Sequence, residues 1–137
     1  MTATELVKLA LEAREHSYCP YSHFAVGAAL LTKSGKIYQG CNIENVSFTP
    51  TICAERTAFF KAVYDGEREF EAIAVVGAPE GAPVSDFCAP CGVCRQVMRE
   101  FCENDFKVYL GKEDGSFMEA SLIEMLPFGF SELNLKG

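Results

Sequence analysis

The sequence predicts an α/β fold, a three-layer α-β-α sandwich in which helices cover both faces of a mixed five-stranded sheet. Two observations support this prediction. Segments with helical periodicity alternate with short apolar segments along the chain, and one of these, residues 70–77, is apolar almost throughout. Such a strand is typical of a sheet that is covered on both faces. With 137 residues, 49% of them hydrophobic, we expect residues 1–137 to form one domain.

The chain is expected to begin with a helix and a hairpin. Thr2 precedes Glu5 by three residues, which is the spacing of a helix capping box, and apolar residues follow at helical intervals. We therefore predict a helix over residues 4–16. Two apolar segments bounded by turn residues, 24–32 and 37–42, predict a β-hairpin.

The middle of the chain predicts two helices on either side of a central strand. Residues 53–64 contain no glycine or proline, which favours a helix. The apolar segment 70–77 is the predicted central strand. Residues 78–90 contain prolines and a glycine and should form an irregular loop. A third helix is expected to run from Cys91 to about Glu103, with the preceding proline in its first turn.

Two short strands and a short helix are expected near the end. Residues 107–110 and 117–120 flank an Asp-Gly turn and predict the last strands. Ser121 and Glu124 have the spacing of a second capping box, and Pro127 should end the helix that follows.

The composition excludes several classes of function. Twelve Lys and Arg residues against nineteen Asp and Glu residues give a net charge of -7, which disfavours a nucleic-acid partner. Membrane insertion is not expected, because no apolar run approaches the ~18 residues that a membrane span needs. The seven cysteines are an odd number, and no N-terminal stretch combines basic residues with a long apolar run, so nothing suggests secretion and oxidative pairing. We therefore expect reduced thiols and a cytoplasmic location.

Four cysteines lie at or near the starts of the second and third predicted helices: Cys53, Cys88, Cys91 and Cys94. A helix N-terminus favours the thiolate, which is the form that binds metal. Cys91 and Cys94 are three residues apart and share a helical face, and Cys53 would supply a third sulfur. Glu55 follows Cys53 by two residues, so its carboxylate can reach the same place.

Three thiolates with one open position describe a catalytic zinc ion, which lowers the pKa of bound water from 15.7 to about 7. A carboxylate beside that water can take its proton. The order Cys-Ala-Glu followed by Pro-Cys-x-x-Cys is the signature of zinc deaminases, with cysteine where other members carry histidine.

Four ordered motifs extend this signature over most of the chain, from about residue 18 to residue 130. They are Phe24-Ala25-Val26-Gly27-Ala28-Ala29, Asn42-Ile43-Glu44-Asn45, Cys53-Ala54-Glu55-Arg56-Thr57 and Pro90-Cys91-Gly92-Val93-Cys94-Arg95-Gln96. On these motifs the chain closely resembles the small cytidine deaminases. The resemblance implies hydrolytic deamination of cytidine and deoxycytidine to uridine and deoxyuridine, with release of ammonia, as part of pyrimidine salvage.

The resemblance also implies the roles of the central residues. One zinc ion per subunit would be held by Cys53, Cys91 and Cys94. Water activated by the ion would attack C4 of the cytosine ring, while Glu55 protonates N3 and later delivers a proton to the departing amine. Arg56, three residues after Cys53, would offset the excess negative charge of three thiolates by bonding to the sulfurs.

The same resemblance assigns the substrate contacts. Asn42 and Glu44 would bind the ribose hydroxyls, Phe24 would pack against the base, and the backbone of Ala54 would read the pyrimidine. The charge of Glu44 adds an independent reason to expect a free nucleoside, because a carboxylate near the sugar repels a 5′-phosphate.

The resemblance to family members of this size also implies a homotetramer whose active sites lie at subunit contacts. Phe130 matches a C-terminal aromatic residue that a neighbouring subunit donates. Gln96 could support the turn that carries Cys94. Phe48 stands where many relatives have tyrosine, so any contact made by that hydroxyl is lost or replaced in this chain.

Alternatives remain at the sequence level. Cys88 could be a fourth ligand in a closed structural zinc site of an interaction protein, or the cysteines could bind an iron–sulfur cluster, although residue 98 is methionine where the bacterial cluster motif needs cysteine. The thiols could also be buried as small apolar groups. Deaminases of other bases, of nucleotides or of blasticidin S share the zinc centre, but Arg56 and the 42–45 motif favour the nucleoside enzyme.

Single candidate residues could also have ordinary structural roles. Glu55 could be an ordinary first-turn glutamate, Arg56 a solvated charge and Glu44 a loop carboxylate, while Phe24 and Phe130 could be core residues. His16 and His23 do not have metal-ligand spacing to the cysteines, so we assign them no role. We interpret Cys19, Cys41 and Cys102 as structural thiols.

Overall fold

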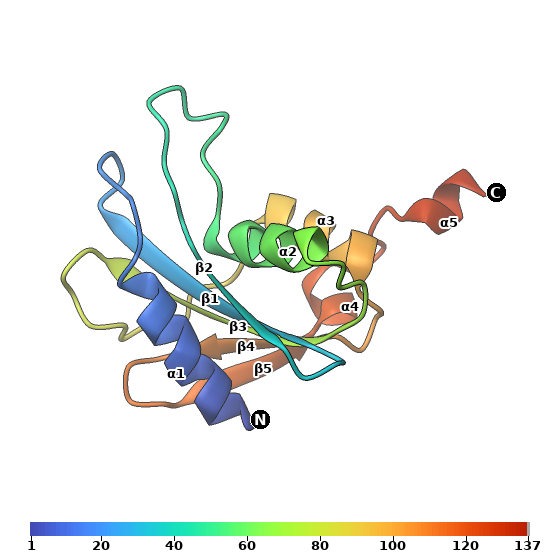
Figure 1. Ribbon diagram of the computed structural model, residues 1–137, viewed down its shortest axis with the longest axis horizontal. Helices are drawn as coiled ribbons and strands as arrows, with labels where there is room; N and C mark the ends of the chain where they lie inside the picture. Colours follow the sequence, from blue (N-terminus) through green and yellow to red (C-terminus); the bar gives the residue numbers. More distant parts are fainter. Residues whose placement is uncertain (137) are drawn as a thin grey trace.

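The computed structural model describes residues 1–136 and contains a five-stranded sheet of order β2-β1-β3-β4-β5 (Figure 1). The strands are β1 (Phe24–Thr32), β2 (Ile37–Cys41), β3 (Phe70–Pro79), β4 (Lys107–Gly111) and β5 (Phe117–Ser121). The central strand β3 pairs antiparallel with β1 and parallel with β4. The predicted mixed sheet is therefore confirmed. Gly137, the last residue of the predicted domain, lies outside the described residues.

Helices cover both faces of this sheet. They are α1 (Ala3–Arg14) on one face and α2 (Ala54–Tyr64), α3 (Gly92–Phe101) and α4 (Leu122–Met125) on the other, whereas α5 (Glu132–Leu135) contributes no buried residue. One buried cluster joins Leu6 and Val7 of α1 to alternate residues of β1 and β3. The other joins Phe59 of α2 and Met98 of α3 to the opposite face of the same strands. The two cores give the three layers that the sequence predicts, with α1 alone on one side (Figure 1).

Two glycines let helices approach the strands to backbone contact. A Cβ atom at Gly27 of β1 would lie 2.1 Å from the carbonyl oxygen of Ala10 in α1. A Cβ atom at Gly40 of β2 would lie 2.4 Å from the carbonyl oxygen of Ala54, at the start of α2. Only glycine fits at such a distance. Gly40 therefore fixes how closely the first turn of α2 approaches the sheet.

Three details differ from the sequence expectations. Cys91 is the N-cap of α3, so Pro90 precedes the helix instead of lying in its first turn. Strand β3 continues to Pro79, into the expected loop, because residues as far as Ala78 and Pro79 still pair with β1. The helix α5 was not predicted; its capping box uses Asn134 where the usual pattern has Glu or Gln.

None of the helices in residues 1–136 has both the length and the apolar character required of a membrane span.

Candidate active site

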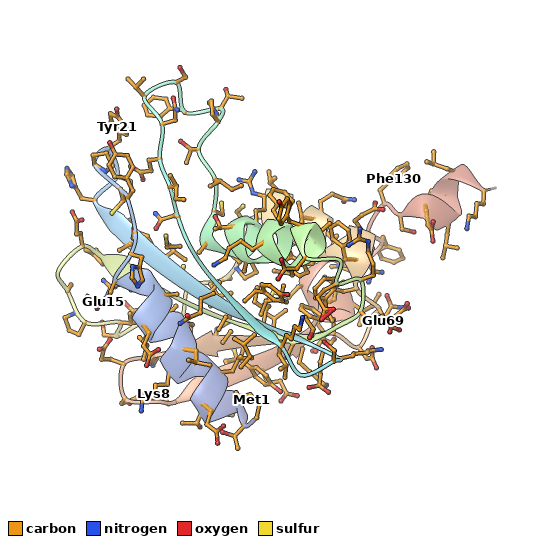
Figure 2. The ribbon with its side chains drawn as sticks, in the orientation of Figure 1. Met1, Lys8, Glu15, Tyr21, Glu69 and Phe130 are labelled. Atoms are coloured by element: carbon orange, nitrogen blue, oxygen red, sulfur yellow. The ribbon has the colours of Figure 1, made fainter. Side chains whose placement is uncertain are left out.

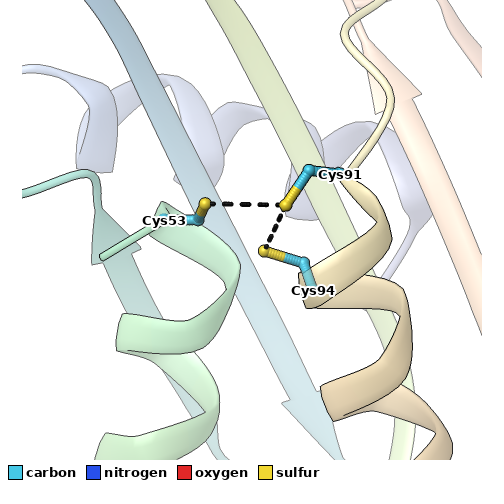
Figure 3. Close-up of side chains that lie close together, drawn as sticks. All are labelled: Cys53, Cys91 and Cys94. Atoms are coloured by element: carbon cyan, nitrogen blue, oxygen red, sulfur yellow. Dashed lines mark hydrogen bonds between the residues drawn. The ribbon is translucent and has the colours of Figure 1, made fainter. Parts of the chain in front are cut away.

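Three cysteine sulfurs from two helix N-termini converge on one point (Figure 3). Cys53 caps α2, Cys91 caps α3, and Cys94 lies buried in the first turn of α3. The Cys91 sulfur is 3.8 Å from that of Cys53 and 3.5 Å from that of Cys94, and all three lie within 4.8 Å of one another. The structure thus brings together the three thiols that the sequence nominates.

This spacing fits a zinc ion. Tetrahedral ligands with Zn–S bonds of about 2.3 Å place their sulfurs about 3.8 Å apart, close to the separations found here. Among the described residues, no other cysteine, histidine or acidic side chain belongs to this group. The donor set of Cys53, Cys91 and Cys94 therefore suits zinc with one coordination position left for a small molecule, the arrangement of catalytic zinc sites.

Cys88 lies outside the three-sulfur group and packs on the sheet. Its sulfur would be 2.8 Å from a Cβ atom at Gly77 of β3, and the Phe24 ring would be 3.0 Å from the same atom. The Cys88 side chain is half-buried, and burial raises the pKa of its thiol. Cys88 does not belong to the group of ligand atoms that lie within 4.8 Å of one another, so its position does not allow it to share an ion with the three sulfurs.

Arg56 supplies positive charge to the sulfur group. It lies one turn after Cys53, and its Nη2 donates a hydrogen bond of 3.3 Å to the Cys53 sulfur. A hydrogen bond from the Cys94 thiol and the Arg56 guanidinium together hold the pKa of Cys53 below its ordinary value, against the effect of burial. Arg56 is therefore oriented toward the thiols, in contrast to a solvated surface charge.

Glu55 is buried in the first turn of α2, with 4% of its surface exposed. Burial raises the pKa of its carboxyl to about 7, and negative charge at Cys53 adds to this effect. A first-turn glutamate that serves only the helix dipole would lie in solvent. This carboxyl instead lies where a proton can be held close to the sulfur group.

Asn42 is buried, and its side-chain amide forms hydrogen bonds with three other residues. Its Oδ1 accepts hydrogen bonds from the hydroxyl of Ser17 at 2.6 Å and from the backbone N–H of Val26 at 3.0 Å. Its Nδ2 donates to the backbone carbonyl of Phe24 at 2.8 Å. The Phe24 side chain is 38% exposed, which differs from a core aromatic residue. Two of the expected substrate residues are thus joined directly.

Glu44 is held by the loop that precedes β1. Its Oε1 accepts backbone hydrogen bonds from Tyr21 at 2.9 Å and Ser22 at 3.0 Å, and its Oε2 accepts one from the Ser22 hydroxyl. These bonds, the Ser22 hydroxyl first, hold the pKa of Glu44 below its usual value. Nothing in the spacing of the sequence pointed to Ser22, because its partner is distant in the chain.

Gln96 and Phe130 interact with each other. The Gln96 side chain donates a hydrogen bond of 2.8 Å to the carbonyl of Phe130, so it anchors the C-terminal segment. The Phe130 ring is 58% exposed and lies outside the sheet and its covering helices (Figure 2). The buried-core interpretation of Phe130 is wrong.

Phe48 lies in the exposed loop after β2. Its side chain is 70% exposed, its φ is 61°, and its ring contacts that of Tyr21 edge-to-face with centroids 6.1 Å apart. Ala54, by contrast, is completely buried as the first residue of α2. The substrate contact expected of the Ala54 backbone stays a prediction.

A three-layer α/β fold that brings three thiols close to a buried carboxyl is typical of a zinc-dependent hydrolase. Residues 1–110 match the cytidine and deoxycytidylate deaminase zinc-binding region. This chain belongs to that deaminase family.

Named relatives agree with this assignment. A cytidine deaminase of Sporosarcina psychrophila is 52% identical over 135 residues, which covers 98% of this chain and 96% of the relative. The crystal structure of cytidine deaminase from Burkholderia pseudomallei has 46% identity and a TM-score of 0.87, covering 95% of this chain and all of the other. A blasticidin-S deaminase of Bacillus cereus is 31% identical over 130 residues, 93% of this chain and 91% of the relative.

Proposed function

We propose that this protein deaminates cytidine and deoxycytidine to uridine and deoxyuridine, releasing ammonia. The observation that carries the proposal is the buried carboxyl of Glu55 beside three sulfurs that fit one zinc ion. The relatives with about half of their residues identical are cytidine deaminases. Pyrimidine salvage in the cytoplasm is the process that this reaction would serve.

The residues of the chain divide the chemistry among them. Cys53, Cys91 and Cys94 would hold the ion, which when bound supplies a Lewis acid that makes water a nucleophile at neutral pH. Glu55 takes a proton from the attacking water and places it on N3 of the cytosine ring as a bond forms at C4. Glu55 then delivers the second proton of the water to the amine, so the C4–N bond breaks and ammonia leaves.

The substrate would lie between the zinc site and the start of β1. Phe24 packs against the base, the backbone of Ala54 contacts the pyrimidine, and Asn42 and Glu44 bind the sugar hydroxyls. Hydrogen bonds from the preceding loop keep Glu44 ionised. A fixed negative charge there disfavours a 5′-phosphate, which supports a nucleoside over a nucleotide.

The assembly that we propose is a homotetramer with shared active sites. Its support is the C-terminal segment, where the exposed Phe130 lies apart from the layers of its own subunit (Figure 2). Phe48 and Phe128 are also exposed, at 70% and 103%. Several large exposed apolar side chains are typical of a surface that another subunit covers.

Ammonia release from a panel of substrates tests the proposed reaction. Cytidine and deoxycytidine should be deaminated, whereas CMP and adenosine should not. Glu55→Gln keeps the shape of the side chain but removes its ability to move protons, so we expect normal zinc content and a loss of turnover of at least about a hundredfold. Full activity of Glu55→Gln would exclude the proton-transfer role.

Blasticidin S belongs in the same panel because one relative, at 31% identity, is a blasticidin-S deaminase. Turnover of blasticidin S without turnover of cytidine would make that antibiotic the substrate and would overturn the proposed reaction while leaving the zinc site in place.

A further inference from the structure

We infer that Ser22 is a positioning residue of the substrate site, whose hydroxyl sets the direction in which Glu44 accepts a hydrogen bond from the sugar. The inference rests on the proposed function, in which Glu44 binds the sugar and Phe24 packs against the base. Ser22 is exposed and carries no charge, and neither the predicted motifs nor the proton chemistry assigns it a role.

The Ser22 hydroxyl connects two substrate residues that come from different parts of the chain. It accepts a hydrogen bond of 3.1 Å from the backbone N–H of Phe24 and donates one to Oε2 of Glu44. The backbone N–H of Ser22 donates to Oε1 of the same carboxylate at 3.0 Å. A chain of donors that ends on a charged group strengthens each bond within it. Ser22 therefore holds the base-packing residue and the sugar-binding carboxylate in one arrangement.

Counting lone pairs shows what remains for a ligand. A carboxylate has about four acceptor sites. Tyr21 and Ser22 occupy both sites on Oε1 of Glu44, and the Ser22 hydroxyl occupies one on Oε2. A single acceptor position on Oε2 is left, and the Ser22 hydroxyl determines where it points.

The buried amide of Asn42 is limited in the same way. Both lone pairs of its oxygen accept hydrogen bonds from within the protein, and one of its two N–H groups donates to Phe24. One N–H donor remains. The site thus offers one donor on Asn42 and one acceptor on Glu44, a pair that matches a single hydroxyl group able to accept and donate at once.

The backbone around Ser22 supports this geometry. His23 has a φ of 56°, a left-handed conformation that is uncommon for residues other than glycine. It is held by hydrogen bonds from its N–H to the Cys19 carbonyl at 3.0 Å and from the Glu80 N–H to its carbonyl at 2.7 Å. The sharp turn at His23 lets Ser22 bond to Phe24 and Glu44 together.

Removal of the hydroxyl should weaken substrate binding more than chemistry. In Ser22→Ala the Glu44 carboxylate loses its only partner on Oε2 and can rotate, so we expect KM for cytidine to rise about tenfold, the range for a hydrogen bond to a charged group. The value of kcat should stay within about twofold, because the hydrogen bonds of Ser22 go to Glu44 and Phe24 and not to the thiols or to Glu55. Ser22→Thr retains the hydroxyl and should restore most of the affinity.

A substrate without ring hydroxyls separates positioning from a general loss of structure. With 2′,3′-dideoxycytidine, Glu44 has no hydroxyl to bind, so Ser22→Ala should change KM by less than about twofold. The ratio of the two KM values within one variant does not depend on the folded fraction. His23→Asn is the matched control, since asparagine tolerates a positive φ and the hydrogen-bond partner of the His23 ring is Glu80 and not Glu44; its KM ratio should equal that of the wild type.

The outcomes distinguish the two proposals. A wild-type protein that does not deaminate cytidine would overturn the proposed function. Active wild-type protein whose Ser22→Ala variant raises KM equally for cytidine and for 2′,3′-dideoxycytidine, or for neither, would overturn the role of Ser22 alone. A double variant with Glu44→Gln provides a second reading, because the effects of Ser22→Ala and Glu44→Gln should not add if Ser22 acts through Glu44.

Discussion

The thiols of this chain differ in what surrounds them. Cys53, Cys91 and Cys94 lie at helix N-termini, where unpaired N–H groups favour a thiolate, and Arg56 donates to one of them. Cys102 is buried at the end of α3, where burial raises the pKa of its thiol. Metal-binding and structural cysteines are therefore separated by position on a helix as well as by spacing in the sequence.

Replacement of Cys88 tests whether the zinc site is open or closed. Cys88→Ser should retain one zinc per subunit and near wild-type kcat, because the Cys88 sulfur packs on β3 and is outside the three-sulfur group. Zinc content by atomic absorption and turnover of cytidine are the measurements. Loss of zinc from Cys88→Ser, to the extent seen in a Cys91→Ser control, would mean that four thiols close the site.

At the scale of elements, the position of α2 matters most, because it presents Cys53, Glu55 and Arg56 within its N-cap and first turn. Gly40 of β2 brings the backbone of that turn against the sheet. Helix α1 approaches the sheet equally closely at Gly27, but it carries no residue of the site. Comparable close contacts on the two faces therefore have different consequences for function.

An alanine at each glycine separates these consequences. Gly40→Ala and Gly27→Ala should each lower the free energy of unfolding by about 1–3 kcal/mol, since the added methyl group meets backbone atoms. Only Gly40→Ala should also weaken zinc retention, because it displaces the start of α2. Thermal unfolding and zinc loss to a chelator, measured on folded protein, are the readouts. Equal zinc retention in the two variants would show that α2 moves without disturbing the thiols.

Much of this architecture could be predicted from local sequence. The apolar segment 70–77 identified the central strand, and Ser121 with Glu124 identified the start of α4 with its capping box. The three thiols could be nominated as metal ligands because their residue type and their positions at predicted helix starts can be read from the sequence. The central strand, the capping box and the spacing of Cys91 and Cys94 depend on neighbours within one turn or one strand.

The features that could not be predicted depend on distant partners. The hydroxyl of Ser22 gains its role from Glu44, which reaches it only through the pairing of the chain around β1 and β2. Gln96 contacts Phe130 because the C-terminal segment returns past α3, which no periodicity encodes. Pro90 is a local signal, but it led to a wrong start for α3. The residue before the N-cap was interpreted as part of the first turn.

At the scale of the whole molecule, the C-terminal segment stands out. Helix α5 extends from the three layers and contributes no buried residue (Figure 1). Leu133 and Leu135 are 71% and 79% exposed within it, and Phe130 precedes it. Exposed leucines on a short terminal helix are hard to explain in an isolated subunit with a net charge of -7. They are consistent with the proposed tetramer, in which this segment would pack on a neighbour.

Subunit mixing provides the sharpest test of shared active sites. Phe130→Ala subunits keep Glu55, and Glu55→Gln subunits keep Phe130, so each variant lacks one part of the same proposed site. If a neighbour donates Phe130, hybrids formed by refolding an equal mixture should contain some complete sites. Their activity should exceed the mean of the two separately refolded variants by several-fold, at substrate concentrations below KM.

A mixture of Phe130→Ala with Phe130→Ala/Glu55→Gln is the control and should show no such gain. Activity of the first mixture equal to the mean, with hybrids verified by mass spectrometry, would place Phe130 in the site of its own subunit or outside any site.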